Sequence, residues 1–144
     1  MRSLAYPSTV AEVLDPPVRF RRATVEAVTC FATSRPWRGS IDERKDKFQQ
    51  LHGDLCRVYG KQTTLRFGPI DGNCSGSSYY SPALDMIELK GTLSVVTYLH
   101  EFAHAIGTID EYSACRWSLN LFRQFFPRSF ARCRAVGHVL LAAR

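Results

Sequence analysis

The segment from Tyr98 to Tyr112 reads YLHEFAHAIGTIDEY and contains the pattern H-E-x-x-H at His100, Glu101 and His104. Residues four apart on an α-helix project side by side, so the imidazoles of His100 and His104 can both reach one metal ion. A catalytic zinc ion takes three protein ligands and keeps a fourth position for water. Glu101 is placed to act on that water as a general base. The segment therefore predicts a metal-binding helix, and the third ligand must come from elsewhere.

The residues around this pattern favour a helix that is buried on one side. Thr92 or Ser94 can cap its start, and Gly107 is a natural end. Apolar residues recur at helical intervals on a stripe that leaves the two histidines on a different face: Val95, Leu99, Phe102 and Ile106.

The first part of the chain is expected to be helical after a flexible tail. Residues 1–15 read as that tail, and residues 16–33 as a helix whose two leading prolines suit its first turn. Ser40 and Glu43 form a capping-box sequence, in which each side chain satisfies a free backbone N–H of the other. The helix that they open is expected to stop at Gly60.

Strands are expected over 63–67 and 85–90, separated by a loop over 68–82 that is rich in Gly, Ser and Asn. Two helices are expected after the metal-binding helix, over 110–126 and 130–142. The order helix, helix, strand, strand, helix, helix, helix predicts the α+β class, with residues 16–144 as a single domain.

Length and composition are those of a globular protein, with 45% hydrophobic and 22% charged residues in a chain of 144. The N-terminal segment has no apolar run of signal-peptide length, and no window approaches the ~18 apolar residues of a membrane span. The five cysteines are scattered without a C-x-x-C pair, which argues against a disulfide framework. We therefore expect a cytoplasmic protein that does not contact a membrane.

The net charge is +6, and 15 of the 19 basic residues are arginines. Basic residues that could attract nucleic acid or an acidic partner gather near the C-terminus: Arg116, Arg123, Arg128, Arg132, Arg134 and Arg144. A solvated helix face is the simpler interpretation, because no pattern of alternating aromatic and basic residues accompanies them.

With its preceding strand and its H-E-x-x-H helix, the segment 85–120 resembles the zincin superfamily of zinc metallopeptidases. The resemblance implies a small zincin-like domain in which helices pack on a short β-sheet. It also implies a Zn²⁺ cofactor held by His100 and His104, with Glu101 as the catalytic base.

The resemblance further implies how substrate binds. In the zincin superfamily an edge strand holds the peptide substrate in an extended conformation, which here implies that Ile87, Glu88 and Leu89 pair with substrate through their backbone groups. Many members use a tyrosine hydroxyl to stabilise the oxyanion, and Tyr112 is a candidate for that role.

Two patterns compete for the third zinc ligand. In H-E-x-x-H-x-x-G-x-x-D, which is similar to that of small bacterial secreted neutral proteases, Gly107 lets the chain turn and implies Asp110 as the ligand. That clan also carries a methionine-containing turn, and this chain has no methionine after Met86. Asp110 could equally cap the helix that follows it.

In the second pattern the third ligand is a glutamate within an E-x-x-A segment, here Glu111 to Ala114. This pattern is similar to that of small intracellular zincins associated with phage, mobile elements and stress-response regulators. Asp110 is the preferred third ligand and Glu111 the alternative, while His52 and His138 remain as further histidines.

The function expected from this pattern is hydrolysis of peptide bonds through a zinc-bound water by a selective intracellular metallopeptidase. A peptide or protein is then the substrate. The alternative function is a metal-binding regulatory or interaction module without proteolytic activity, associated with nucleic acid through the C-terminal arginines.

Overall fold

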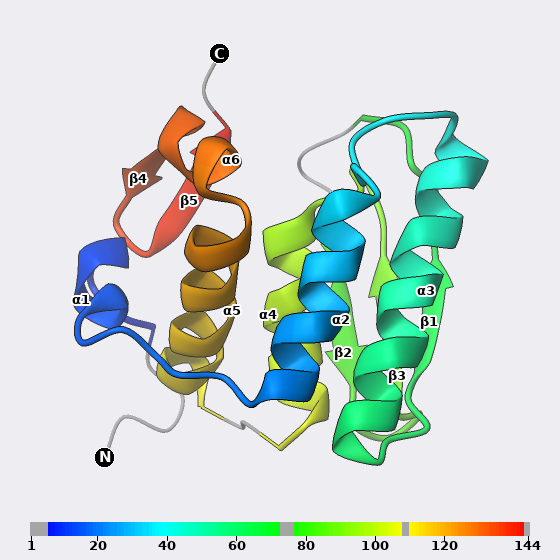
Figure 1. Cartoon of the computed structure of the whole chain (residues 1–144), viewed down its shortest axis with the longest axis horizontal. Helices are drawn as coiled ribbons and strands as arrows, with labels where there is room; N and C mark the ends of the chain where they lie inside the picture. The colour runs from blue at the N-terminus through cyan, green and yellow to red at the C-terminus, as the bar shows by residue number, and fades with distance from the viewer. Residues whose placement is uncertain (1–5, 73–76, 108–109, 143–144) are drawn as a thin grey trace. The chain divides into compact units, whose positions relative to one another are not determined.

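The computed structural model describes residues 6–72, 77–107 and 110–142 (Figure 1). Contacts within the chain divide it into two compact units. Unit 1 combines Met1–Arg19 with Val95–Arg144, and unit 2 is Phe20–Ser94. Both helices and small sheets are present, which confirms the α+β class. The division differs from the expected single domain over 16–144, because the N-terminal residues group with the last third of the chain.

Unit 2 begins with two helices, α2 (Arg22–Thr33) and α3 (Ile41–Tyr59). They lie side by side in Figure 1, and the rings of Phe31 and Phe48 meet edge to face with centroids 5.1 Å apart. The predicted capping box is confirmed, because Glu43 N donates to Ser40 Oγ and Ser40 N donates to Glu43 Oε1. α2 starts at Arg22, so the two prolines at 16 and 17 precede the helix and do not open it.

The sheet of unit 2 has the strand order β1-β3-β2, formed by β1 (Thr64–Phe67), β2 (Tyr79–Ser81) and β3 (Met86–Leu89). β1 pairs with β3 in parallel, and β2 pairs with β3 in antiparallel fashion. The two predicted strands are confirmed, whereas β2 lies in the segment expected to be loop. All four residues of β3 are buried, as suits the central strand of a sheet.

Unit 1 contains α1 (Val10–Leu14), α4 (Val95–Ala105) and α5 (Glu111–Phe125). The prediction of a flexible tail over 1–15 is wrong for its described residues, 6–15. Thr9 caps α1, and apolar side chains of α1 are buried with two residues of α5 in one cluster: Val10, Val13, Leu14, Cys115 and Leu119. A helix of five residues is not stable alone, so this burial is what holds α1.

Polar side chains of α5 bind the C-terminal end of α1. Arg116 Nη1 and Asn120 Nδ2 each donate to Val13 O at 2.9 Å, and Arg123 Nη2 donates to Leu14 O at 3.0 Å. These carbonyl groups end a helix and have no partner within it, so the side chains satisfy them. Two of the six C-terminal arginines are thus engaged in holding the fold of unit 1.

The helix expected over 130–142 is wrong. The structure has a short helix α6 (Pro127–Arg132), followed by an antiparallel hairpin of β4 (Cys133–Val136) and β5 (Val139–Ala142). Gly137 and His138 form the two-residue turn, a connection typical of hairpins. Among the described residues, no helix is long and apolar enough to cross a membrane.

Candidate metal centre

The packing of α5 on α4 brings His100, His104 and Glu111 together. α4 carries His100 and His104 and ends at Ala105. Gly107 has a φ of 110°, a conformation that side chains with a Cβ rarely adopt, so a glycine is suited to turn the chain here. α5 then begins at Glu111 and packs along α4.

The Glu111 carboxylate lies against both histidines. Its Oε2 is 2.9 Å from His100 Nε2, and its Oε1 is 3.0 Å from His104 Nε2. The side chains are half-buried, at 19% exposed for His100, 13% for His104 and 21% for Glu111. Within the described part of the chain, they are the one group of three metal-ligating side chains whose ligand atoms all lie within 4.8 Å of one another.

The structure does not bring Asp110, the preferred third ligand, together with the two histidines. Asp110 is the N-cap of α5, where Oδ1 accepts from Ser113 N at 2.6 Å and Oδ2 accepts from Ser113 Oγ at 3.0 Å. Its carboxylate satisfies a backbone N–H that the first turn of a helix leaves free. The alternative, Glu111, is the acidic residue that the structure places with the two histidines.

The surroundings of His100 favour the neutral imidazole. Burial lowers the pKa of His100, with a further lowering from His104, and together these outweigh the raising effect of the Glu111 carboxylate. The contact between His100 and Glu111 is therefore a hydrogen bond between a neutral ring and a carboxylate. A neutral ring is also the form that binds a metal ion.

A cysteine lies on the other side of the His100 ring. Cys115 Sγ is 3.8 Å from His100 Nδ1, and burial together with the nearby Glu111 carboxylate raises the pKa of this thiol to about 12. Cys115 follows Glu111 by four residues on α5, so helical spacing alone puts both on one face. A metal ion at Nε2 would leave the proton of the neutral ring on Nδ1, from which the Cys115 sulfur could accept a weak hydrogen bond.

A cavity of about 230 Å³ opens beside this centre. Its wall includes His100 and Glu101 from α4 and Leu119 from α5, and His138 and Leu140 from the C-terminal hairpin. Glu101, the predicted general base, thus faces a space that a substrate could enter. His138 lies in the wall of the cavity and is not part of the ligand cluster.

The tyrosine at this cavity is Tyr6, which the sequence did not identify. Tyr6 lines the cavity, and its ring stacks on the imidazole of His138 with centroids 4.3 Å apart. Burial raises the pKa of Tyr6, and the negative charge of Glu111 raises it further. Tyr112, the predicted oxyanion donor, instead donates to Glu12 O at 3.4 Å and packs on the cluster of α1 and α5. No local sequence pattern identifies Tyr6 as a residue of this site, because the segment that contains it was predicted to be a flexible tail.

The predicted use of Ile87, Glu88 and Leu89 as an edge strand for substrate is wrong. These residues lie in β3, which has β1 on one side and β2 on the other. Its backbone groups therefore pair with neighbouring strands, and the edges of this sheet belong to β1 and β2. His52, a further histidine in unit 2, is bound through Nε2 to Thr63 O at 2.6 Å.

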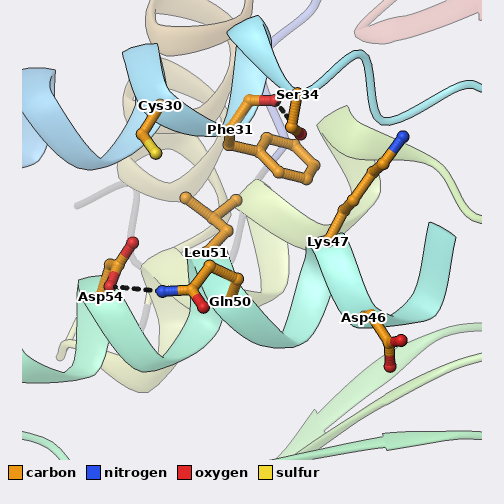
Figure 2. Close-up of a pocket in the computed structure, with 8 residues that line it drawn as sticks. All are labelled: Cys30, Phe31, Ser34, Asp46, Lys47, Gln50, Leu51 and Asp54. Carbon is orange, nitrogen blue, oxygen red and sulfur yellow. Dashed lines mark hydrogen bonds between the residues drawn. The ribbon is translucent and has the colours of Figure 1, made fainter. Parts of the chain in front are cut away.

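A second cavity, of about 210 Å³, lies between α2 and α3 of unit 2 (Figure 2). Its lining is mostly apolar and includes Phe31, Leu51 and the exposed thiol of Cys30. At its rim Gln50 Nε2 donates to Asp54 Oδ1 at 3.1 Å. None of the residues of the metal-ligating cluster line this cavity, so the chemistry predicted from the sequence belongs to unit 1.

Comparison of the chain with protein-family models, with curated proteins and with solved structures found no match.

Proposed function

We propose that this protein is a zinc-dependent metallopeptidase with a zincin-like active site on α4 and α5. His100, His104 and Glu111 hold the zinc ion, and Glu101 is the general base. The observation that carries the proposal is the position of the Glu111 carboxylate, with one oxygen 2.9 Å from His100 Nε2 and the other 3.0 Å from His104 Nε2.

The three side chains fit zinc in kind and in spacing. Two imidazole nitrogens and one carboxylate oxygen form a donor set of catalytic zinc sites, which leaves one position open. Tetrahedral ligands about 2.0–2.1 Å from a zinc ion lie roughly 3.3 Å from one another. The contacts of 2.9 and 3.0 Å, one from each oxygen of Glu111, are close to that spacing, and the ligand atoms of the three residues all lie within 4.8 Å of one another.

Zinc, when bound, supplies the Lewis acidity that makes water nucleophilic at neutral pH and polarises a carbonyl group. Glu101 accepts the proton of the attacking water as its oxygen bonds to the carbonyl carbon. Glu101 then gives this proton to the amide nitrogen as the C–N bond breaks, which releases a carboxylic acid and an amine. Its place in the wall of the cavity, next to His100, suits both transfers.

The size of the cavity supports a selective enzyme. A space of about 230 Å³ with Leu119 and Leu140 in its wall holds one apolar side chain of a peptide and little more. We therefore propose a peptide or protein substrate that presents an apolar residue next to the scissile bond.

The test combines zinc stoichiometry with peptide cleavage, on the wild type and on Glu101→Gln. We expect one zinc ion per chain in both proteins by native mass spectrometry, since Glu101 is not a ligand. We expect cleavage of a peptide library by the wild type alone, with a loss of at least about 10²-fold in Glu101→Gln. Cleavage by both proteins would remove Glu101 from the mechanism.

Two other outcomes separate the parts of the proposal. A wild-type protein that holds one zinc ion and cleaves no peptide would be a metal-binding module without proteolytic activity. A wild-type protein that binds no zinc, even when zinc is supplied in excess, would lack the metal centre altogether.

A further inference from the structure

The C-terminal hairpin of β4 and β5 is held in unit 1 by one of its faces and by its turn. Leu140 packs against the buried cluster of α1 and α5. At the turn, Val10 N donates to Gly137 O at 2.9 Å, which ties the hairpin to the start of α1. The hairpin thus has a fixed place beside the candidate metal centre, and its residues His138, Val139 and Leu140 form part of the cavity wall.

The opposite face of the hairpin presents apolar side chains to solvent. Val136 pairs with Val139, and Arg134 pairs with Leu141. Because the side chains of cross-strand partners share a face and successive residues alternate, these four side chains lie on the face opposite to Leu140. The exposed fractions are 53% for Val136, 41% for Val139 and 38% for Leu141. Exposed apolar side chains that adjoin one another are typical of binding surfaces.

Basic side chains adjoin this apolar face. Arg128 and Arg132 are four apart on α6, so they lie on one side of the helix, and Arg134 follows after one extended residue. All three are exposed, and among the described residues their side chains have no hydrogen-bond or ion-pair partner. No Asp or Glu follows Glu111 in the chain, so this segment contains no acidic residue to neutralise them. The positive charge of these arginines is therefore available to a ligand.

These exposed side chains of α6 and the hairpin form one surface, which we call the hairpin surface: Arg128, Arg132, Arg134, Val136, Val139 and Leu141. Val139 belongs to this surface and also to the wall of the cavity, together with His100 and Glu101. An extended peptide advances ~3.3 Å per residue. A peptide with one side chain in the cavity can thus reach the hairpin surface with residues only a few positions further along.

We propose that the hairpin surface binds a segment of the protein substrate that carries acidic and apolar residues, a few positions from the bond that is cleaved. The role in cleavage rests on the proposed function, whereas the binding itself needs no metal ion. The arginines attract carboxylates, and the valines and the leucine cover apolar side chains. None of the six side chains is aromatic, so the surface lacks the stacking platform typical of sites for single-stranded nucleic acid.

The experiment measures binding of two fluorescently labelled peptides to the metal-free full chain by anisotropy. Physiological ionic strength is used, because it screens charges that lie far from the ligand. One peptide contains Glu and Leu in mixed order, and the other has Lys in place of every Glu. We expect the acidic peptide to bind and the basic peptide not to bind. Equal binding of the two peptides, or no binding of the acidic one, would overturn the inference.

A triple variant removes the charge of the hairpin surface by combining Arg128→Gln, Arg132→Gln and Arg134→Gln. Exposed ion pairs contribute roughly 1.5- to 5-fold each to an equilibrium constant, so we expect the Kd of the acidic peptide to rise about tenfold. Because these side chains are exposed and bind no other described residue, the variant should fold as the wild type does.

The matched control removes the same number of charges from exposed arginines elsewhere, by combining Arg19→Gln, Arg22→Gln and Arg38→Gln. Its Kd for the acidic peptide should stay within about twofold of that of the wild type, because distant charges are screened. An equal rise of the Kd in both triple variants would mean general attraction by the net charge, and would overturn the inference.

A further variant and two competitors test the class of ligand. Val136→Thr keeps the shape of the side chain and all charges but removes apolar contact, so the Kd of the acidic peptide should rise several-fold. An unchanged Kd would contradict the apolar part of the proposed ligand. Duplex DNA and phosphatidylserine vesicles are the competitors. Tighter binding of either one than of the acidic peptide, lost in the Arg128, Arg132 and Arg134 variant, would assign the surface to that ligand and overturn the inference.

Two results distinguish failure of this inference from failure of the proposed function. If the wild type binds the acidic peptide through the three arginines but cleaves no peptide when zinc is supplied, the proposed function fails and the hairpin surface stands as a binding site. If the wild type cleaves peptides but the charge of the hairpin surface has no effect on binding, the proposed function stands and this inference is overturned.

Discussion

Asp110 and Glu111 are neighbours in the chain, but their carboxylates have different partners: Asp110 accepts from the backbone N–H of Ser113, and Glu111 faces the two histidines of α4. The difference follows from their positions on α5. Asp110 is the N-cap, whose side chain turns back over the first turn of its own helix. Glu111 is the first helical residue, and its longer side chain reaches across to α4.

The first prediction concerns these two acids. Glu111→Gln should weaken zinc binding strongly, because a neutral amide replaces a charged ligand, whereas Asp110→Ala should leave zinc affinity within a few-fold of the wild type. Asp110→Ala should lower the free energy of unfolding by ~0.5–2 kcal/mol through the lost cap.

Asp110→Asn, which keeps a capping oxygen, is the control. Chelator competition and urea denaturation measure the two effects, and zinc loss in Asp110→Ala with retention in Glu111→Gln would restore Asp110 as the ligand.

The second prediction concerns Asn120, which is fully buried and joins α5 to the segment around α1. Its Nδ2 donates to Val13 O and its Oδ1 accepts from Val18 N at 3.2 Å. Asn120→Ala should lower the free energy of unfolding by about 2–4 kcal/mol, because it leaves buried polar groups without partners and opens a small void. Gln124→Ala is the matched control on the same helix.

The control removes a comparable but exposed contact, in which Gln124 Nε2 donates to Val18 O at 2.9 Å. Gln124→Ala should change the free energy of unfolding by no more than about 0.5 kcal/mol, as most surface substitutions do. Equal urea-denaturation curves for the two variants would show that burial of the amide does not matter.

The third prediction contrasts a glycine inside α3 with the glycine that caps its C-terminal end, and at both positions an added methyl group would meet open space. Gly53 lies inside the helix, where its ideal Cβ comes no closer than 3.9 Å to Arg57 Nη1. Gly60 ends the helix with a φ of 64°. Gly53→Ala should raise the free energy of unfolding by about 0.5–1 kcal/mol, because alanine loses less backbone entropy in a helix. Gly60→Ala should lower it by roughly 1–2 kcal/mol, because a Cβ is strained in the left-handed region.

Thermal and urea denaturation of these two single variants give the sign of each change in the free energy of unfolding. Because neither substitution removes a contact, opposite signs can come only from the backbone conformation. Two effects of the same sign would contradict the prediction.

The fourth prediction is a pH dependence of stability that originates at His52. Burial lowers the pKa of His52, and this outweighs the raising effects of its hydrogen bond to Thr63 O and of the Asp85 carboxylate. Below the unfolded-state pKa of about 6.5, the unfolded chain therefore binds a proton that the folded chain does not bind. The free energy of unfolding should be constant for this group above about pH 7. It should decrease as the pH falls below 6.5 toward the lower pKa of the folded state.

His52→Gln provides the comparison, because the amide keeps a donor for Thr63 O and does not titrate. Urea denaturation of the metal-free proteins at pH 7 and pH 5 should show a larger loss of stability for the wild type than for His52→Gln. Equal losses would assign the acid sensitivity to other groups.

The sequence predicts those parts of the fold and of the site that depend on residues close together in the chain. H-E-x-x-H is a local pattern, since helical geometry alone brings His100 and His104 to one face of α4. The capping box at Ser40 and the two strands β1 and β3 are local in the same sense, and all of them are confirmed. These elements depend on residues within a few positions of one another.

The predictions that were wrong concern features that residues close together in the chain do not determine. The segment 133–142 has apolar residues at spacings that a helix also allows, but pairing between β4 and β5 through the turn at Gly137 fixes it as a hairpin. β3 reads as a strand from its residues, but its central position depends on β2, a three-residue strand with little periodicity of its own.

The sequence by itself thus determined the α+β class, the helix that carries H-E-x-x-H and two of the three side chains that meet in the candidate metal centre, because each rests on hydrogen bonds and side-chain spacing within a single helix or strand. Tertiary structure alone decided between Asp110 and Glu111, since both spacings suit the sequence and only the packing of α5 on α4 shows which carboxylate meets the histidines. It also decided the place of Tyr6, which lies in the wall of the same cavity as His100 and Leu119 although more than ninety residues of chain separate them, because α1 is buried against α5. Contacts of that range depend on the folded arrangement of separate elements, which no local spacing encodes.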